Sequence, residues 1–358
     1  MASSNLIFYA GWKAFQRIRS GGIAPDDVQV VAGAAGGPKW LVLGHLERTV
    51  FSTWFKDREK PLFLVGSSSG AWRFAMVAQS DPVAAIDRFE TAYIHQYYSK
   101  DPSPDDIQRE AFRIISETMP DEGPGQILSH PFLRLNIMAV RCKGPVVREN
   151  KYMQMAGMIG AIGLNMIHRR GLKFFFDRAL FYDPRDLPPF IKMDGFPIQR
   201  VKLSAANLRR AMMASGAIPI LMPGITDIPG APDGTYRDGG VVDYHMDLPY
   251  PSKGGIVLMF HYTDHIIPEW LDKTLPWRRP SVRNMENVLM VGPSPSFLSR
   301  LPHGKIPDRN DFKLFLGRDT ERVAYWQTAA DAGLHLSNDF MEAVLSGRIR
   351  RLVQPMIR

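Results

Sequence analysis

The chain of 358 residues is 45% hydrophobic, which is enough for a large buried core and excludes a chain that is disordered throughout. Its net charge of +8, from 44 Lys and Arg against 36 Asp and Glu, favours anionic ligands, but no basic block is long enough to indicate a nucleic-acid-binding tail. The single cysteine, Cys142, excludes an internal disulfide, and its strand-like surroundings predict a buried, unreactive thiol.

Neither a secretory signal nor a membrane span is predicted. Residues 1–15 lack a basic segment before their short apolar run. No segment offers the roughly 18 uninterrupted apolar residues that a transmembrane helix requires. We therefore expect a cytoplasmic protein that can bind peripherally to a membrane and that has no nucleic-acid partner.

Strands, glycine turns and helices alternate in the first part of the chain. Residues 28–32 predict a buried strand, and the turn GAAGGP leads from it into a helical pattern over 39–55. Residues 62–65 predict the next strand, and 71–79 the next helix. This order is typical of an α/β fold with a mostly parallel central sheet flanked by helices.

The chain as a whole predicts one domain over residues 1–358, because no repeat, linker or shift in composition divides it. A long helical segment with one polar face covers 83–118, and a loop rich in Pro, Asp and Gly covers 119–126. The other expected elements are strands near 135–143, 200–204 and 256–260, and helices near 206–215, 319–332 and 338–346.

The segment 152–167, YMQMAGMIGAIGLNMI, predicts an apolar helix whose glycines share one face. One interpretation is a membrane-facing cap whose basic tail, HRRGLKFFFDR, contacts lipid headgroups. The other is a buried helix with a solvated end. We favour the buried helix, because Gln154 and Asn165 interrupt the apolar run.

The stretch GSSSG at residues 66–70 lies between the second strand and its helix. Gly-x-Ser-x-Gly at such a turn is typical of a nucleophile elbow, where Gly66 and Gly70 let neighbouring backbones pass close to Ser68. The helix that follows directs free N–H groups and its positive dipole end toward Ser68. A flexible Ser/Gly loop is the alternative, and the pattern alone does not decide between the two.

A second glycine turn, GAAGGPK at residues 33–39, can supply backbone amides. Gly36 and Gly37 let the backbone approach a ligand, and N–H groups aimed at a carbonyl oxygen stabilise the transition state of acyl transfer. A Walker phosphate loop is disfavoured because Trp40 follows Lys39 where a hydroxyl is needed. A dinucleotide-binding turn lacks its second strand and acidic residue. An ordinary tight turn is the structural alternative.

A third turn carries Asp238, followed by Gly239 and Gly240. Asp-Gly is also a common hairpin signal. The functional interpretation is that this rigid turn presents a carboxylate to Ser68, whose hydroxyl needs a neighbour that accepts its proton. Burial in a dry site would raise the pKa of the carboxyl above its usual value of about 3.9 and make it a stronger base.

The order of these motifs, a glycine turn, then GSSSG, then DGG far downstream, resembles the patatin-like phospholipase family. AMMASGAIPILMPG at 211–224 is similar to the family's Ser-x-Ala-x-Pro segment, and RDGGVVDYHMDLP at 237–249 to its DGG segment. The resemblance covers residues 28–250 as a catalytic core and implies a patatin-like three-layer α/β fold with the nucleophile on a strand–turn–helix elbow. Residues 251–358 would form a C-terminal extension packed on that core.

The resemblance implies a lipid acyl hydrolase of the phospholipase A or lysophospholipase kind, which cleaves carboxylic esters through an acyl-enzyme and needs no cofactor. Ser68 would be the nucleophile and Asp238 the base of a Ser–Asp dyad. Its partners would be a lipid or other acyl-ester substrate and, transiently, an anionic membrane surface. The oxyanion hole would involve Gly36, Gly37, Lys39 and Ser69. Ala34, Ala35 and Trp40 depart from the family's glycine-rich turn, and Asp243 and His245 stand where the family often has asparagines.

Two alternatives come from other classes. Ser68, Asp238 and either His261 or His303 follow the chain order of an α/β-hydrolase triad. We prefer the dyad, because an α/β-hydrolase elbow normally follows several strands and this one follows a single clear strand. A non-catalytic lipid-binding protein of the same fold is the second alternative, and the intact Ser68 and Asp238 pair argues against it.

Two further patterns are weaker. HYTDH at 261–265 has ligand-type side chains but lacks a third convincing ligand, so no metal site is expected. Met212, Met213 and Met222 are close in sequence to the dyad segment and could line an acyl pocket, because methionine adapts to irregular apolar ligands. Ordinary core packing explains them equally well.

Overall fold

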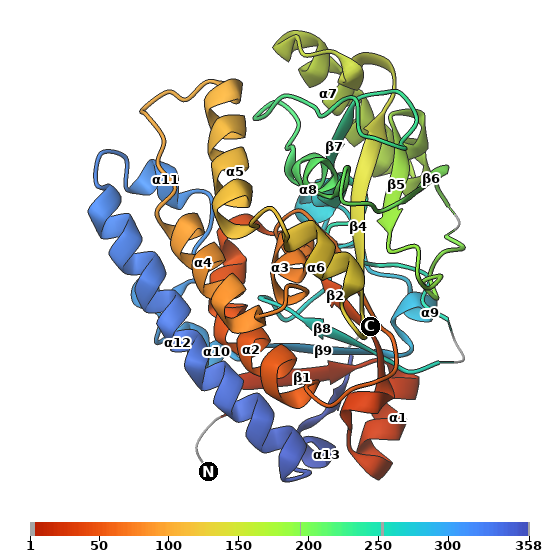
Figure 1. Ribbon diagram of the computed structural model, residues 1–358, viewed down its shortest axis with the longest axis vertical. Helices are drawn as coiled ribbons and strands as arrows, with labels where there is room; N and C mark the ends of the chain where they lie inside the picture. Colours follow the sequence, from red (N-terminus) through yellow and green to blue (C-terminus); the bar gives the residue numbers. More distant parts are fainter. Residues whose placement is uncertain (1–3, 194, 252–253, 357–358) are drawn as a thin grey trace.

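The computed structural model describes residues 4–193, 195–251 and 254–356. The protein is built around a ten-stranded, mostly parallel sheet (Figure 1). The order across the sheet is β10-β1-β9-β8-β2-β3-β4-β5-β6, and β7 pairs with β4. The strands are β1 (Leu6–Ala10), β2 (Val28–Gly33), β3 (Leu62–Ser67), β4 (Leu133–Cys142), β5 (Phe176–Tyr182), β6 (Ile198–Lys202), β7 (Tyr236–Asp238), β8 (Ile256–Phe260), β9 (Val288–Pro293) and β10 (Gln354–Pro355).

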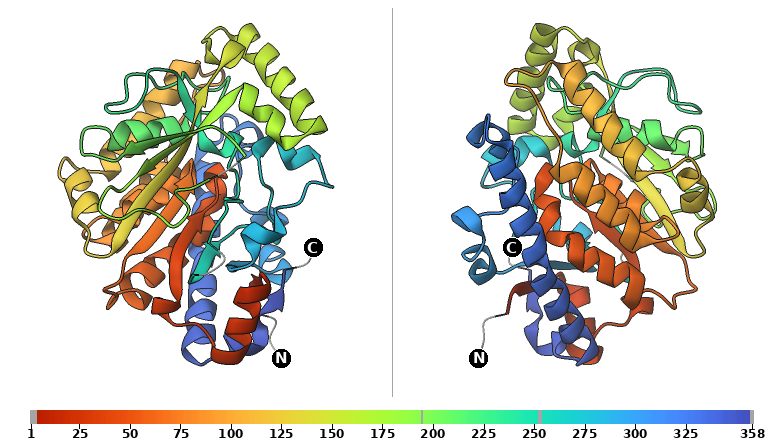
Figure 2. Two further views of the ribbon diagram at one scale, coloured as in Figure 1. Left: turned by 90° about the vertical axis from the view of Figure 1, so that its right-hand side faces the viewer. Right: turned by 60° about the vertical axis from the view of Figure 1, so that its left-hand side comes forward.

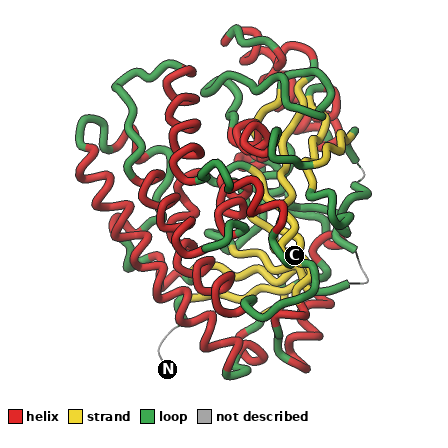
Figure 3. The backbone as a smooth tube through the Cα atoms, in the orientation of Figure 1, coloured by secondary structure: helices red, strands yellow, loops and turns green. Residues whose placement is uncertain are grey.

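Helices surround this sheet, as Figure 3 shows with the strands in yellow and the helices in red. The α-helices are α1 (Trp12–Gly21), α2 (Gly44–Thr49), α3 (Ser69–Val77), α4 (Pro82–Ile94), α5 (Pro104–Thr118), α6 (Gly123–Ser129), α7 (Lys151–Ile167), α8 (Leu208–Gly216), α9 (Val282–Met285), α10 (Pro295–Leu298), α11 (Asp311–Leu314), α12 (Asp319–Leu345) and α13 (Ile349–Leu352). The irregular helices that matter for the site are η2 (Gly37–Leu43), η6 (Gly239–Val241) and η7 (Trp270–Thr274).

The two faces of the sheet are covered differently. Alternate strand residues such as Val31 and Leu64 lie in one core with α2, α3, α4 and α12, which lie together in the right-hand view of Figure 2. Their neighbours Val30 and Val65 lie in a second core, which the loop 246–250 helps to cover. Helix α7 packs over β4 and β5 in a third core. The predicted α/β class, with a mostly parallel sheet flanked by helices, is confirmed.

The strands predicted near 28–32, 62–65, 135–143, 200–204 and 256–260 are confirmed as β2, β3, β4, β6 and β8. The helices predicted over 71–79 and 206–215 are confirmed as α3 and α8. The helical pattern predicted over 39–55 is confirmed as three consecutive helical segments, namely η2, α2 and a π-helical turn.

Two helix predictions and one loop prediction are wrong in detail. The segment 83–118 divides into α4 and α5, because Ser103 and the proline after it begin a new helix. The expected loop 119–126 ends in the first turns of α6. The two helices expected near 319–332 and 338–346 are the single helix α12, which continues through Gly333. The glycine allows close packing there, because a Cβ would lie 2.5 Å from the carbonyl oxygen of Val42.

The preferred interpretation of α7 as a buried helix is also wrong. Tyr152, Ile159 and Ile167 are 79%, 66% and 82% exposed, and further apolar side chains of the same helix are exposed beside them. Gln154 and Asn165, which interrupt the apolar run, are instead buried, together with Gly157, Met158 and Ala161. The helix is therefore held to the protein by one buried face that includes its polar side chains, and it shows an apolar face to the outside.

Residues beyond 250 contribute to the sheet itself. Strand β8 lies between β2 and β9, and β1 pairs with β9 and β10, so the first and last strands of the described chain lie side by side at one edge of the sheet. The segment expected as a C-terminal extension thus supplies three strands, and its helix α12 packs against α2, η2 and β1. No helix among the described residues is long and apolar enough to cross a membrane.

Candidate active site

Ser68 occupies a strained turn between β3 and α3. Its backbone has φ 52° and ψ −128°, in the region that L-residues rarely adopt. The two flanking glycines allow the turn, because a Cβ at Gly66 would lie 2.6 Å from the amide nitrogen of Ala71 and one at Gly70 would lie 2.2 Å from the carbonyl oxygen of Gly33. The predicted strand–turn–helix elbow is therefore present, with Ser68 at its apex.

A buried hydroxyl on α8 holds this turn. The amide of Ser68 donates a hydrogen bond to Ser215 Oγ at 2.8 Å, and Ser215 Oγ donates to the carbonyl oxygen of Met138 at 2.6 Å. Ser215 is fully buried. It therefore fixes the elbow to β4, a role that its place in the Ser-x-Ala-x-Pro segment did not by itself reveal.

Asp238 reaches Ser68 because Ser68 directly follows β3 and Asp238 ends β7, and both strands pair with β4. In β3, Ser67 lies opposite Met138, and in β7, Asp238 lies opposite Ala139. Ser68 Oγ donates a hydrogen bond to Asp238 Oδ2 at 2.8 Å. The two side chains are 170 positions apart in the sequence and are thus brought together by one shared strand.

The second carboxylate oxygen of Asp238 is fixed by its own turn. The amide of Gly240 donates to Asp238 Oδ1 at 2.7 Å, and Gly239 begins η6 directly after the aspartate. The amide of Asp238 donates to the carbonyl oxygen of Ala217 at 2.9 Å. These bonds leave Oδ2 directed at the hydroxyl of Ser68.

Burial raises the pKa of Asp238 above its ordinary value. The positive charge of Arg309, the amide of Gly240, the hydroxyl of Ser68 and the charge of Lys273 act in the opposite direction, but burial outweighs them. A carboxylate with a raised pKa accepts a proton more readily at neutral pH, which suits a general base.

Three amides near Ser68 are free to bind an oxyanion. Within the described residues, the N–H groups of Gly36, Gly37 and Ser69 have no hydrogen-bond acceptor. Gly37 has a φ of +59°, and it begins η2 as Ser69 begins α3, so both amides lie at the first position of a helix. The side chain of Lys39 lies over the Tyr262 ring, with its Nζ 5.0 Å from the ring centroid.

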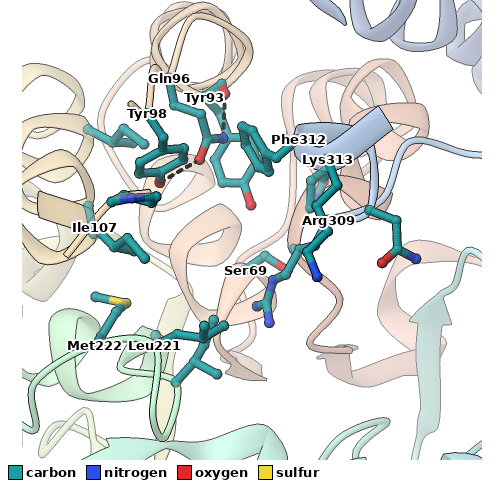
Figure 4. Close-up of a pocket in the computed structure, with 18 of the residues that line it drawn as sticks. Ser69, Tyr93, Gln96, Tyr98, Ile107, Leu221, Met222, Arg309, Phe312 and Lys313 are labelled. Carbon is teal, nitrogen blue, oxygen red and sulfur yellow. Dashed lines mark hydrogen bonds between the residues drawn. The ribbon is translucent and has the colours of Figure 1, made fainter. Parts of the chain in front are cut away.

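Ser68 lies between two cavities. The apolar cavity, of about 510 Å³, includes Trp72, Ile107, Leu221 and Phe312 in its wall (Figure 4). The cationic cavity, of about 330 Å³, is lined by the following charged residues together with Tyr244 and Trp270: Lys39, Asp238, Lys273, Asp308 and Arg309. Ser68 and Arg309 line both cavities, so a ligand at Ser68 can extend into each.

No protein-family model matches the chain, and no curated protein sequence matches it either. Among solved structures, the chain is similar to VipD from Legionella pneumophila, with a TM-score of 0.34 and 11% sequence identity. The match covers 87% of this chain and 67% of VipD. At this level of similarity, any functional conclusion depends on the geometry of the site itself.

None of the described histidines lines either cavity. His261 is fully buried, and its Nδ1 accepts a hydrogen bond from the amide of Thr263 at 3.0 Å. His303 packs against the rings of Phe315 and Tyr325. The geometry therefore disfavours the Ser–Asp–His alternative, because the proton acceptor in contact with Ser68 is a carboxylate.

The methionines, the single cysteine and the ligand-type side chains were the other candidates. Met222 lines the apolar cavity, whereas Met212 and Met213 are buried and line neither cavity. Cys142 is buried as predicted, and burial raises the pKa of its thiol to about 12. Across the described part of the chain, no group of three or more His, Cys, Asp and Glu side chains is arranged to hold a metal ion.

Lys273 and Arg309 are the site residues that sequence reasoning missed. They lie on η7 and just before α11, beyond the stretch that carries the three motifs. Neither belongs to a recognisable pattern, and the sequence contains many other Lys and Arg residues. Only the packing of the segment after residue 250 against the elbow brings them to Ser68.

Proposed function

We propose that the protein is a lipid acyl hydrolase of the patatin-like type, with Ser68 as the nucleophile and Asp238 as the base. The 2.8 Å hydrogen bond from Ser68 Oγ to Asp238 Oδ2 carries this proposal, because it couples a hydroxyl on an elbow to a buried carboxylate with a raised pKa. The free amides beside Ser68 and the order of the three motifs support it.

In the first half of the reaction, Ser68 Oγ attacks the carbonyl carbon of the ester while its proton passes to Asp238 Oδ2. The carbonyl oxygen becomes an oxyanion, which the amides of Gly36, Gly37 and Ser69 stabilise. The tetrahedral intermediate collapses by breaking the bond to the alcohol oxygen. That oxygen takes the proton back from Asp238 and leaves, and the acyl group stays on Ser68.

In the second half, a water molecule attacks the acyl-enzyme and gives one proton to Asp238. The bond between the acyl carbon and Ser68 Oγ breaks, and Ser68 recovers its proton from Asp238. The carboxylic acid leaves, and the enzyme is regenerated without a cofactor. The apolar cavity is the natural place for the acyl chain, because its wall offers the apolar surface that a hydrocarbon chain requires.

The chemistry can be tested by trapping the nucleophile. We expect a fluorophosphonate probe to label the folded wild-type protein once, and mass spectrometry to locate the label on Ser68. Labelling should be lost when the protein is heat-denatured, because the reaction depends on the elbow and on Asp238. The labelled protein should no longer release fatty acid from a panel of acyl esters. An unlabelled wild type that releases no acid would instead favour the non-catalytic, lipid-binding alternative.

We further propose that the exposed face of α7 meets an anionic membrane surface. Residues 148–174 contain five Lys and Arg residues and one Glu, and that Glu is paired with Arg237 at 2.8 Å. Arg169 is paired with Asp247 and Glu269, and the four exposed cations are Arg148, Lys151, Arg170 and Lys173. A helix with an exposed apolar face and flanking cations matches a bilayer with acidic headgroups. The exposed side chain of Phe174 extends the apolar surface beyond the end of the helix.

The contacts of α7 place this surface next to the site. Gln154 Oε1 accepts a hydrogen bond from the amide of Ile220 at 2.8 Å, and the loop after Ile220 lines both cavities. Asn165 Nδ2 donates to Asp272 Oδ1 at 2.8 Å, and Asp272 precedes Lys273 of the cationic cavity. The two buried polar residues of α7 therefore anchor it to segments that form the walls of the site.

The double variant Ile159→Glu/Ile167→Glu should bind vesicles that contain phosphatidylserine at least about tenfold more weakly than the wild type. Each substitution removes an apolar side chain whose burial is worth roughly 1.5–3 kcal/mol. Flotation of protein with vesicles measures the bound fraction. Leu334→Glu on α12 is the matched control, because Leu334 is also an exposed apolar residue on a helix. Equal binding by the double variant and the wild type would contradict the assignment of this surface.

A further inference from the structure

Three basic side chains surround the cationic cavity beside Ser68. Lys39 comes from η2, Lys273 from η7, and Arg309 from the segment before α11. Lys273 Nζ lies 4.3 Å from the centroid of the Tyr244 ring. A Cβ at Gly37 would lie 3.0 Å from Arg309 Nε, so the guanidinium lies directly beside the proposed oxyanion turn. In Figure 4, Arg309 extends into the pocket toward Ser69.

These three cations have no ion-pair partner among the described residues. None of their side-chain nitrogens lies within salt-bridge distance of a carboxylate, although Asp238 and Asp308 line the same cavity. Asp308 is instead engaged by Lys305, whose Nζ lies 3.1 Å from it. Asp238 is bonded to Ser68 and Gly240. The cavity therefore holds an excess of positive charge that the described chain leaves uncompensated.

The two cavities divide a bound ester in a definite way. If the acyl chain lies in the apolar cavity, the alcohol part of the ester extends from Ser68 into the cationic cavity. Arg309 lines both cavities and so lies at the boundary between them. Lys273 and Lys39 line the cationic cavity and are not part of the wall of the apolar cavity. Lys39 and Lys273 thus lie on the side of the leaving group, whereas Lys100 and Lys313 line the apolar cavity together with Asp319.

We propose that the cationic cavity binds an anionic group, a phosphate or a carboxylate, on the alcohol side of the ester, through Lys39, Lys273 and Arg309. The inference rests on the proposed function for the orientation of the ester, but not for the anion site itself. A guanidinium can donate two parallel hydrogen bonds to a phosphate or carboxylate, and two ammonium groups add charge without a fixed geometry. The substrate class that follows is an acyl ester of an anionic alcohol.

The titration of Lys273 is consistent with this site. Partial burial in the cavity, with Lys39 and Arg309 nearby, lowers the pKa of Lys273 to about 7, and Asp238 and Asp308 only partly offset this. Lys273 is charged below this pKa and neutral above it. An anion that binds in the cavity stabilises the charged form, so its binding should weaken as the pH rises through about 7.

The test uses a pair of ether analogues that the enzyme cannot cleave, so that it does not depend on catalysis. The anionic probe is 1-O-hexylglycerol 3-phosphate and the neutral probe is 1-O-hexylglycerol. In calorimetric titrations with the wild type, we expect the anionic probe to bind at least about tenfold more tightly than the neutral one. Because a phosphate monoester itself gains negative charge between pH 6 and pH 8, the pH dependence is measured with hexyloxyacetate, an ether whose carboxylate keeps its charge in this range, and its affinity should fall from pH 6 to pH 8. Inorganic phosphate alone and hexyloxyacetate also serve to distinguish a phosphate site from a general anion site.

Lys273→Met and Arg309→Met should each weaken the anionic probe by about tenfold or more, and Lys273→Met should also remove the pH dependence. Lys56→Met is the matched control. This substitution removes the same charge, but Lys56 is exposed and lines neither cavity. Equal affinities for both probes in the wild type, or equal losses in the control, would overturn the anion site. Binding of the anionic probe without any ester hydrolysis would overturn the proposed function and leave the anion site standing.

Discussion

Replacing Ser68 by alanine is expected to abolish hydrolysis of acyl esters, with a loss of about 10⁶-fold in kcat. Without the hydroxyl, no acyl-enzyme can form, and the carboxylate of Asp238 has no proton to accept from a nucleophile. The free amides remain and would leave only a small residual rate. The loss in kcat is measured as the release of fatty acid from a panel of esters by the variant and by the wild type.

The alanine variant also needs a check of its fold. The substitution removes the donor to Asp238 Oδ2, and the loss of one buried hydrogen bond costs about 1–3 kcal/mol of stability. Thermal unfolding should therefore show a moderately lowered but cooperative transition. A folded Ser68→Ala protein that hydrolyses esters at the wild-type rate would exclude Ser68 as the nucleophile.

Asp238→Asn should lower kcat by roughly 10²–10⁴-fold, because an amide cannot accept the proton of Ser68. Asparagine has nearly the same shape and can keep the hydrogen bond from the amide of Gly240, so its effect reports on the base. In the wild type, activity should fall as the pH drops through the raised pKa of Asp238, since protonation removes the base. The residual activity of the variant should lack this acid limb. Steady-state rates from pH 4 to pH 8 measure both effects.

Histidine variants provide the control for the Asp238 prediction. His303→Ala should retain wild-type kcat, because His303 lies outside both cavities. His261→Gln tests the buried histidine with a side chain that can keep a hydrogen bond to Thr263. Near-full activity in Asp238→Asn together with a large loss in either histidine variant would replace the dyad by a Ser–Asp–His triad.

The central strands and the nucleophile turn could be predicted because their signals are local. A buried apolar run followed by glycines and a second apolar run defines β3, the elbow at Ser68 and α3 within fewer than twenty residues. The turn of Asp238 was visible as an Asp-Gly pair. The contact between Ser68 and Asp238 came from the order of the motifs, and in the structure it follows from the pairing of β3 and β7 with β4.

Other features depend on packing that no local pattern encodes. The helix α7 has the composition of a core helix, and its exposure depends on which neighbours cover it. Gln154 and Asn165 favoured a buried helix because they interrupt the apolar run, yet the helix is largely exposed and these two side chains make buried contacts. Lys273 and Arg309 are ordinary basic residues until the segment beyond 250 folds against the elbow.

The pairing of β1 has a consequence for how the molecule is made. Leu6 and Phe8 in this strand are buried, and within the described chain β1 pairs with β9 and β10 alone. During synthesis, β1 emerges before both of its partners, which follow only once residues 288–355 have been translated. The apolar side chains of β1 therefore stay unpaired in the nascent chain throughout that interval, and exposed apolar surface of this kind favours aggregation.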